Sequence, residues 1–353
     1  MKKALLLLNL GTTEAPEPKE TGVYLREFLM DPLVLDIPSF WRWFLVNIII
    51  VPRRKIASAR AYKKIWLREG SPLLFYSQQL VGSLTQHLQG KFLVILGMRY
   101  GKPSIRQALE ELKNAGVESM YILPLYPQFA DSSTRTALLK VRDELSSLNW
   151  SPQIAKCLPH FFWFSGYSKA FAESIDDLNK EFCADHILFS YHGLPQRHLS
   201  QRRDLRNVCR FDGQCCGEWS SRNALCYRAQ CFDTTRRIVQ LLDIDPNRSS
   251  TAFQSRLGRA KWILPSIEDE LSRLARAGVK RLLVSCPSFV TDCLETLEEV
   301  GVRMKDLFME LGGEDLLLVP SLNSQEVWVK TLPEVLESNL WKDFPEILDD
   351  LKA

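Results

Sequence analysis

The sequence contains the same α/β pattern twice, and this repeat is the strongest constraint on its fold. Residues 108–129 read ALEELKNAGVESMYILPLYPQF, and residues 270–290 read ELSRLARAGVKRLLVSCPSFV. Each stretch has apolar residues at three- and four-residue spacing, typical of a helix, and then Ala-Gly-Val and a short continuous apolar run. Continuous apolar runs are typical of strands covered on both faces, as in a parallel sheet.

Other segments repeat in the same order along the chain. LLLLNLG (5–11) matches HILFSYHG (186–193), and FLVILGMRY (92–100) matches STAFQSRLG (250–258). Strands alternating with helices predict right-handed βαβ crossovers. We therefore predict an α/β protein of two similar Rossmann-like lobes, each a parallel sheet flanked by helices, with the active-site cleft between them. The expected divisions are 1–170, 171–324 and a helical C-terminal extension, 325–353.

Polar residues stand where the predicted strands end. Ligands of open parallel sheets bind beyond the carboxyl ends of the strands, so these residues are candidates for a binding site. They are Asn9, Arg99, Tyr100, Tyr126, His192, Gln254, Ser255 and Ser288. Neither G-x-G-x-x-G after a strand nor G-x-x-x-x-G-K-[ST] is present, so we expect no nucleotide cofactor.

His192 has the strongest position among these residues, because it joins a buried strand to the turn Gly-Leu-Pro. A neutral imidazole there could act as a base, although many histidines are simply satisfied core residues. The acidic partner is expected on SFVTDCLETLEEV (288–300), where Asp292 and Glu295 enter a helix. Acids are common at helix N-termini, so their presence there is weak evidence of function. The hypothesis that they act with His192 depends on their position at the same predicted sheet edge.

The overall charge and the ends of the chain limit its partners. With 353 residues and a net charge of +3, the chain is not expected to bind nucleic acid through bulk electrostatics. The apolar run near Met1 is short and suits a first strand better than a signal peptide, which predicts cytoplasmic residence. FWRWFLVNIIIV (40–51), followed by PRRK, is too short to span a bilayer. It is either a buried helix or an amphipathic lip at a membrane or an apolar ligand.

Five of the nine cysteines lie within residues 209–231. In a reducing compartment such clusters indicate metal or redox chemistry rather than disulfides. The spacing C-x5-C-C-x9-C-x4-C differs from that of usual zinc sites, so zinc, a 2Fe-2S cluster and free thiols all stay open. The clustered residues are Cys209, Cys215, Cys216, Cys226 and Cys231. Cys157, Cys183 and Cys286 lie in apolar runs and are expected to be buried.

Four strings together resemble the ferrochelatase family: FLMDPLVLDIP (28–38), LPLYPQF (123–129), FSYHGLP (189–195) and SFVTDCLETL (288–297). The resemblance covers most of the chain and implies two Rossmann-like lobes around a porphyrin cleft. It implies insertion of Fe²⁺ into protoporphyrin IX, the last step of haem biosynthesis. Within this resemblance, a chelatase for another metal or tetrapyrrole, or a catalytically silent iron–sulfur or tetrapyrrole-binding sensor, is the alternative.

The resemblance also implies roles for single residues. His192 accepts pyrrole protons, Glu295 and Asp292 relay protons or metal, and Fe²⁺ is taken up at His192 and Glu295. The implied porphyrin contacts are Leu10, Arg99, Tyr100, Tyr126 and Trp262. Two positions depart from the usual pattern: Cys293 stands for a histidine, and Leu10 for a methionine that faces the ring.

The cysteine segment resembles that of a microbial subset of the family, which holds a 2Fe-2S cluster in an internal segment after the histidine motif. The resemblance implies that four of the five clustered cysteines bind the cluster, with Cys215 and Cys216 as alternatives for one position. The segment around 38–52 then resembles the family's active-site lip, which implies peripheral contact with the inner membrane surface.

Overall fold

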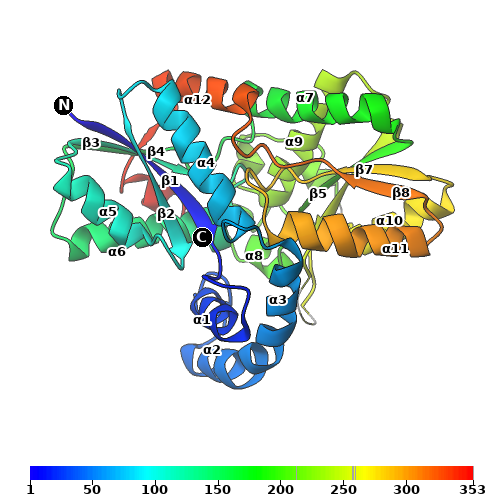
Figure 1. The fold of residues 1–353 in the computed structure, drawn as a ribbon, viewed down its shortest axis with the longest axis horizontal. Coiled ribbons are helices and arrows are strands. Elements are labelled where there is room, and N and C mark those ends of the chain that lie inside the picture. Colours follow the sequence, from blue (N-terminus) through cyan, green and yellow to red (C-terminus); the bar gives the residue numbers. More distant parts are fainter. Residues whose placement is uncertain (212, 257, 259, 353) are drawn as a thin grey trace. The chain divides into compact units, whose positions relative to one another are not determined.

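A computed structural model describes residues 1–353 except 212, 257, 259 and 353 (Figure 1). The chain divides into two compact units. The first contains residues 1–125, 130–159 and 332–352, and the second contains residues 126–129 and 160–331. Each unit is built around one sheet.

The first unit holds a five-stranded sheet of order β2-β1-β3-β4-β9, in which β1 to β4 are parallel and β9 is antiparallel. Its strands are β1 (Lys3–Gly11), β2 (Leu93–Tyr100), β3 (Ser119–Pro124), β4 (Ile154–Cys157) and β9 (Lys342–Asp343). Its helices are α1 (Pro18–Leu29), α2 (Ser39–Phe44), η1 (Leu45–Ile50), α3 (Val51–Ile65), α4 (Pro72–His87), α5 (Ile105–Asn114), η2 (Asp131–Arg135), α6 (Thr136–Ser147) and α13 (Ile347–Asp350). Residues 4–8 of the central strand β1 are fully buried, as the continuous apolar run predicts.

The second unit holds a four-stranded parallel sheet of order β6-β5-β7-β8. Its strands are β5 (His186–His192), β6 (Ser249–Gln254), β7 (Arg281–Ser285) and β8 (Asp315–Leu318). Its helices are α7 (Ser165–Phe182), α8 (Gln196–Ser200), η3 (Gln214–Cys216), η4 (Ser221–Asn223), α9 (Tyr227–Leu242), η5 (Pro246–Arg248), α10 (Ile267–Arg276), η6 (Glu295–Met304) and α11 (Lys305–Glu310). Helix α12 (Glu326–Glu337) has residues in each unit.

The repeat predicted from the sequence is confirmed, because β2-β1-β3-β4 and β6-β5-β7-β8 are the same strand order. The match between the two units extends to the turns that follow β2 and β6. The Met98 amide donates to the Pro103 carbonyl at 2.7 Å, and the Phe253 amide donates to the Pro265 carbonyl at 2.9 Å. A serine then caps the next helix in both units: Ser104 precedes α5 and Ser266 precedes α10.

Two local expectations are wrong. The helix that carries the acidic residues begins at Glu295, so Asp292 lies in the turn before it. The reason is that the turn is held by side chains: the Cys293 amide donates to the Thr296 hydroxyl at 3.0 Å. Cys183 is exposed rather than buried, because it ends α7 in the left-handed conformation, with φ of 50°.

Candidate active site at the carboxyl edge of the second sheet

His192 is the last residue of β5, the second sheet's central strand. The β5–β6 ladder continues to His192, opposite Gln254, but the β5–β7 ladder stops at Phe189. Side chains replace the missing strand beyond that point. The His192 amide donates to Ser288 Oγ at 3.4 Å, and the Tyr227 hydroxyl donates to the His192 carbonyl at 2.8 Å.

The tautomer of the His192 ring follows from its one backbone contact. Nδ1 lies 2.7 Å from the Gly193 carbonyl oxygen. A carbonyl only accepts hydrogen bonds, so this contact requires the proton on Nδ1 and leaves the lone pair on Nε2. The ring is half-buried at the sheet edge. Its geometry therefore suits a group that accepts a proton.

The π-helical segment η6, which begins at Glu295, carries two of the acidic residues, Glu295 and Glu299. Glu299 accepts hydrogen bonds from the amide and the hydroxyl of Ser255, which directly follows β6. Burial raises the pKa of Glu299; Glu295 also raises it, whereas Arg303 and His192 lower it. Glu299 is therefore within electrostatic range of both Glu295 and His192.

Asp292 is placed differently from the other predicted acid, Glu295. It is buried, and its carboxylate accepts hydrogen bonds from the Thr296 hydroxyl at 2.9 Å, the Ser321 amide at 3.2 Å and the Asn323 side chain at 2.8 Å. A carboxylate with this many donors holds a turn together.

Trp262 lies against the residue that follows the histidine. A Cβ atom at Gly193 would meet its ring at 3.3 Å, and Pro195 and Trp262 form an isolated bridge. Leu257 and Arg259, in the same loop, lie outside the described residues. Tyr126, which also belongs to the second unit, is buried.

Two of the predicted substrate residues of the first unit, Arg99 and Tyr100, contact an acid that the sequence did not reveal. Asp31 accepts hydrogen bonds from Arg99, from the Tyr100 hydroxyl at 2.9 Å and from the Thr136 hydroxyl. Tyr100 is fully buried, and burial together with the Asp31 charge raises its pKa. Leu10, at the end of β1, is half-exposed. Asp31 stands in the string FLMDPLVLDIP, where its place before Pro32 was the available signal.

The cysteine segment surrounds the start of α9 in the second unit. Cys215 Sγ and Cys216 Sγ are 3.8 Å apart. The pKa of the Cys216 thiol is lowered to about 6, chiefly by a hydrogen bond from the Cys226 thiol. Burial, together with the neighbouring Cys215 and Cys216, raises the pKa of Cys209 to about 11. Four thiols are therefore neighbours, whereas Cys231 is fully buried beside Tyr227.

No three histidine, cysteine or acidic side chains in the described part of the chain are arranged to hold a metal ion. The sulfur atoms of Cys209, Cys215, Cys216 and Cys226 are nonetheless the type of donor that an iron–sulfur cluster uses, and all four are linked by interactions with one another. The chemistry of this donor set fits such a cluster. Asp212, in the same segment, lies outside the described residues.

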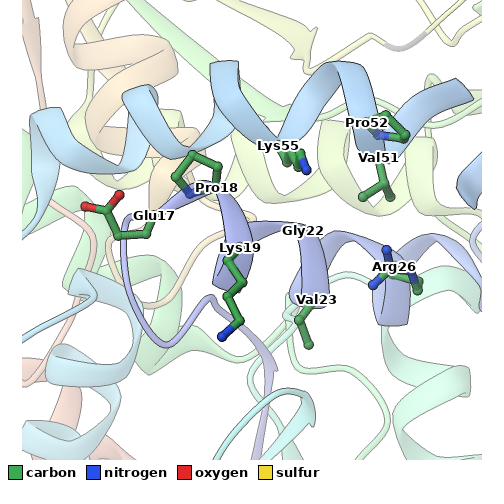
Figure 2. A pocket seen from close by; sticks show the side chains of 9 residues that line it. All are labelled: Glu17, Pro18, Lys19, Gly22, Val23, Arg26, Val51, Pro52 and Lys55. Carbon is green, nitrogen blue, oxygen red and sulfur yellow. The ribbon is translucent and has the colours of Figure 1, made fainter.

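The apolar window 40–51 is not a buried helix, which resolves one alternative from the sequence. It forms α2 and η1, where Val46 is the buried residue, whereas Phe40 and Trp41 are 67% and 60% exposed. A hollow of about 560 Å³ lies beside it between α1 and α3 (Figure 2). None of the helices described here has the length and apolar character that crossing a membrane requires.

Known proteins resemble this chain along nearly its whole length. The ferrochelatase family profile matches residues 2–340. A ferrochelatase of Coxiella burnetii (strain Dugway 5J108-111) is 44% identical over 339 residues, covering 96% of this chain and 94% of that protein. A ferrochelatase of Legionella pneumophila (strain Paris) is 41% identical over 342 residues, covering 96% and 100%. The solved structure of SirB from Bacillus subtilis with Fe³⁺ covers 96% of this chain, with a TM-score of 0.49 and 10% identity.

The two parallel sheets of equal strand order, each flanked by helices, define an α/β protein built from two similar Rossmann-like units. The chain belongs to the ferrochelatase family, whose members are lyases that insert Fe²⁺ into protoporphyrin in haem biosynthesis.

Proposed function

We infer that this chain catalyses the reaction of its family, the insertion of Fe²⁺ into protoporphyrin IX to form protohaem. The reaction exchanges two inner pyrrole protons for one Fe²⁺, so the enzyme must accept protons beside the ring. The observation that carries the proposal is the Nδ1 contact of His192 with the Gly193 carbonyl, which leaves Nε2 free of the tautomeric proton.

In this mechanism His192 takes a pyrrole proton on Nε2. The imidazolium that forms is stabilised by the charge of Glu299, with which His192 interacts, because opposite charges favour each other's charged forms. Glu299, whose pKa burial raises, is suited to receive a proton, and Glu295 stands one turn earlier on the same segment. The two acids therefore form a route that leads protons away from the ring.

The metal reaches the ring as a substrate. Imidazole and carboxylate are both suitable ligands for Fe²⁺, so we assign its uptake to His192 and Glu295. The predicted relay role of Asp292 is replaced here by an anchoring role, because its carboxylate is engaged with three donors. The remaining predicted porphyrin contacts are Leu10, Arg99, Tyr100, Tyr126 and Trp262. Trp262, whose ring packs on Gly193, is the best supported of these.

Anaerobic incubation with Fe²⁺ and protoporphyrin IX tests the proposal, with porphyrin fluorescence and haem absorbance as readouts. His192→Ala should abolish haem formation but retain porphyrin binding, and Glu295→Gln should slow it strongly. His186→Ala is the matched control, because His186 lies at the opposite end of β5 and contacts Ser250 instead. Haem formation by His192→Ala at the wild-type rate would refute the assignment.

We further propose that the cysteine segment holds a 2Fe-2S cluster. The support is the common neighbourhood of Cys209, Cys215, Cys216 and Cys226, which makes these four the preferred ligands. Cys231 is the fifth candidate; its burial beside Tyr227 favours a structural role. A bound cluster would supply metal–thiolate bonds that fix the segment's fold. Iron–sulfur absorbance should be lost in Cys216→Ser with Cys226→Ser and kept in Cys231→Ser.

We also propose cytoplasmic residence with peripheral contact at the inner membrane surface. None of the nine cysteines forms a disulfide, as suits a reducing compartment. Helix α2 exposes aromatic side chains, and the basic residues Lys19, Arg26 and Lys55 line the hollow between α1 and α3 (Figure 2). Arg26 also donates to Asn47 of η1, the segment that directly follows α2. Apolar residues bordered by lysine and arginine are typical of a surface that lies on an anionic bilayer.

A further inference from the structure

The backbone of His192 is held by two hydroxyl groups that touch neither its ring nor the carboxylates. Tyr227 Oη donates to the His192 carbonyl at 2.8 Å, and Ser288 Oγ accepts from its amide at 3.4 Å. The two hydroxyls are also 3.2 Å from each other. We call Tyr227 and Ser288 the hydroxyl clamp. It acts just where the β5–β7 ladder has ended, so the clamp fixes the peptide groups on both sides of His192.

Tyr227 is well placed to donate a hydrogen bond to the His192 carbonyl. It is 5% exposed, and its hydroxyl is shielded from water and directed at the His192 carbonyl. It is the first residue of helix α9 and lies beside Cys231 in the interior of the second unit. A displacement of the first turn of α9 would therefore move the donor that holds the His192 carbonyl.

The first turn of α9 is attached directly to the cysteine segment. Cys226, the residue before Tyr227, donates its amide to the Asn223 carbonyl at 2.9 Å. The buried Asn223 side chain donates to the carbonyls of Cys215 at 2.9 Å and Glu218 at 2.8 Å. Gln230, one turn into α9, donates to the Ala224 carbonyl. The positions of the thiols and of Tyr227 are thus linked by short, continuous contacts.

We propose that Tyr227 is a positioning residue for His192, and that bonding of the Cys216 and Cys226 thiols sets its position. The second half of this proposal rests on the proposed metal–thiolate cluster, whereas the first half does not. The thiol segment then controls the position of His192 through Tyr227, without taking part in proton transfer. Its bonded form holds the first turn of α9 in place, and loss of the thiolates loosens the hydroxyl clamp.

The test uses the full-length protein labelled with ¹⁵N-histidine, because the state of the His192 ring can then be read without an activity assay. His192→Ala identifies the signal. Tyr227→Phe removes one hydroxyl and should shift the His192 ring resonances and lower kcat on the order of tenfold, with the KM for porphyrin unchanged. A factor of that size corresponds to the loss of one net hydrogen bond. Ser288→Ala, a second and less buried change, should shift the same signal.

Tyr191→Phe is the matched control. It also removes a buried tyrosine hydroxyl with one partner, Thr235 at 2.9 Å, but that hydroxyl does not contact His192. Its His192 signal should stay at the wild-type position. An unchanged signal in both Tyr227→Phe and Ser288→Ala would overturn the positioning role.

The thiol link is tested by combining changes. Cys216→Ser with Cys226→Ser should reproduce the Tyr227→Phe shift at His192 and add nothing when Tyr227→Phe is already present. Independent, additive shifts would overturn the link. The visible spectrum reports the cluster separately and the haem assay reports the reaction, so failure of either proposed function is distinguishable from failure of the clamp.

Discussion

Ser255 presents both its amide and its hydroxyl to the carboxylate of Glu299, and it does so from the left-handed region, with φ of 65°. For a residue with a side chain this conformation costs on the order of 1 kcal/mol. The surrounding contacts maintain it, so the strand end is shaped to hold a buried carboxylate.

Glu299→Gln should change how stability depends on pH. Because the pKa of Glu299 is raised in the folded protein, the folded state binds a proton more tightly than the unfolded state. The stabilisation from this group is fully present below the unfolded pKa and is lost as the pH rises through the folded pKa. The free energy of unfolding of Glu299→Gln, relative to wild type, should therefore improve between pH 4 and pH 7 in urea titrations. A constant difference across that range would contradict the raised pKa.

Asp31→Asn should destabilise the first unit by about 3 kcal/mol, since it leaves the Arg99 charge buried without its partner. The Asp31 side chain is 3% exposed in this pair. Asp143→Asn is the control, because it breaks an Arg–Asp pair whose acid is 61% exposed, and its effect should stay below about 0.5 kcal/mol. Chemical unfolding measures both changes. Equal losses for the two variants would mean that burial of the pair is unimportant.

Gly11→Ala should prevent normal folding or cost several kcal/mol. A Cβ there would lie 1.7 Å from the Tyr100 carbonyl oxygen, and φ is 110°. Gly82→Ala, in helix α4 with nothing within 4 Å of the added carbon, should instead stabilise by about 0.5–1 kcal/mol. Thermal melting distinguishes the two signs. A tolerated Gly11→Ala would show that the end of β1 can shift away from β2.

Phe40→Ser with Trp41→Ser should weaken binding to vesicles that contain anionic lipid, because it removes the most exposed aromatics of α2. Leu241→Ser removes an apolar side chain that is 54% exposed on α9 and should leave vesicle binding unchanged. Co-sedimentation measures both, and haem formation from detergent-dispersed porphyrin checks that the site is intact. Equal vesicle binding by wild type and the double variant would remove the proposed membrane contact.

The sequence was sufficient for the fold because its short apolar runs are continuous and repeat in the same order. Residues 5–11 and 186–193 form the central strands of two sheets with the same strand order, as their pattern predicts. The edge that carries His192 followed from the same reasoning. Long-range pairing was beyond it: nothing in FLMDPLVLDIP shows that Asp31 meets Arg99, which is 68 residues away.

The local backbone geometry of the acidic segment could not be predicted from the sequence either. The acids after β7 have a spacing that suits an α-helix, whereas the segment is π-helical and begins at Glu295. A turn stabilised by Asp292 and Thr296 delays its start, and that depends on Ser321 and Asn323, far along the chain. Tyr227 was missed for a similar reason, since its partner at His192 is 35 residues away, although its place directly after Cys226 was visible.

The shared strand order also allows the two halves to be aligned residue by residue. Met98 and Phe253 make the same contact with the proline after their strands, and they pair with Asn9 and Tyr191. The next residues along the central strands are Leu10 and His192, so these two occupy equivalent places in a duplicated fold. One copy offers an aliphatic side chain where the other offers an imidazole. Under the proposed function, the same place in the fold would contact the apolar macrocycle in one half of the chain and accept its protons in the other.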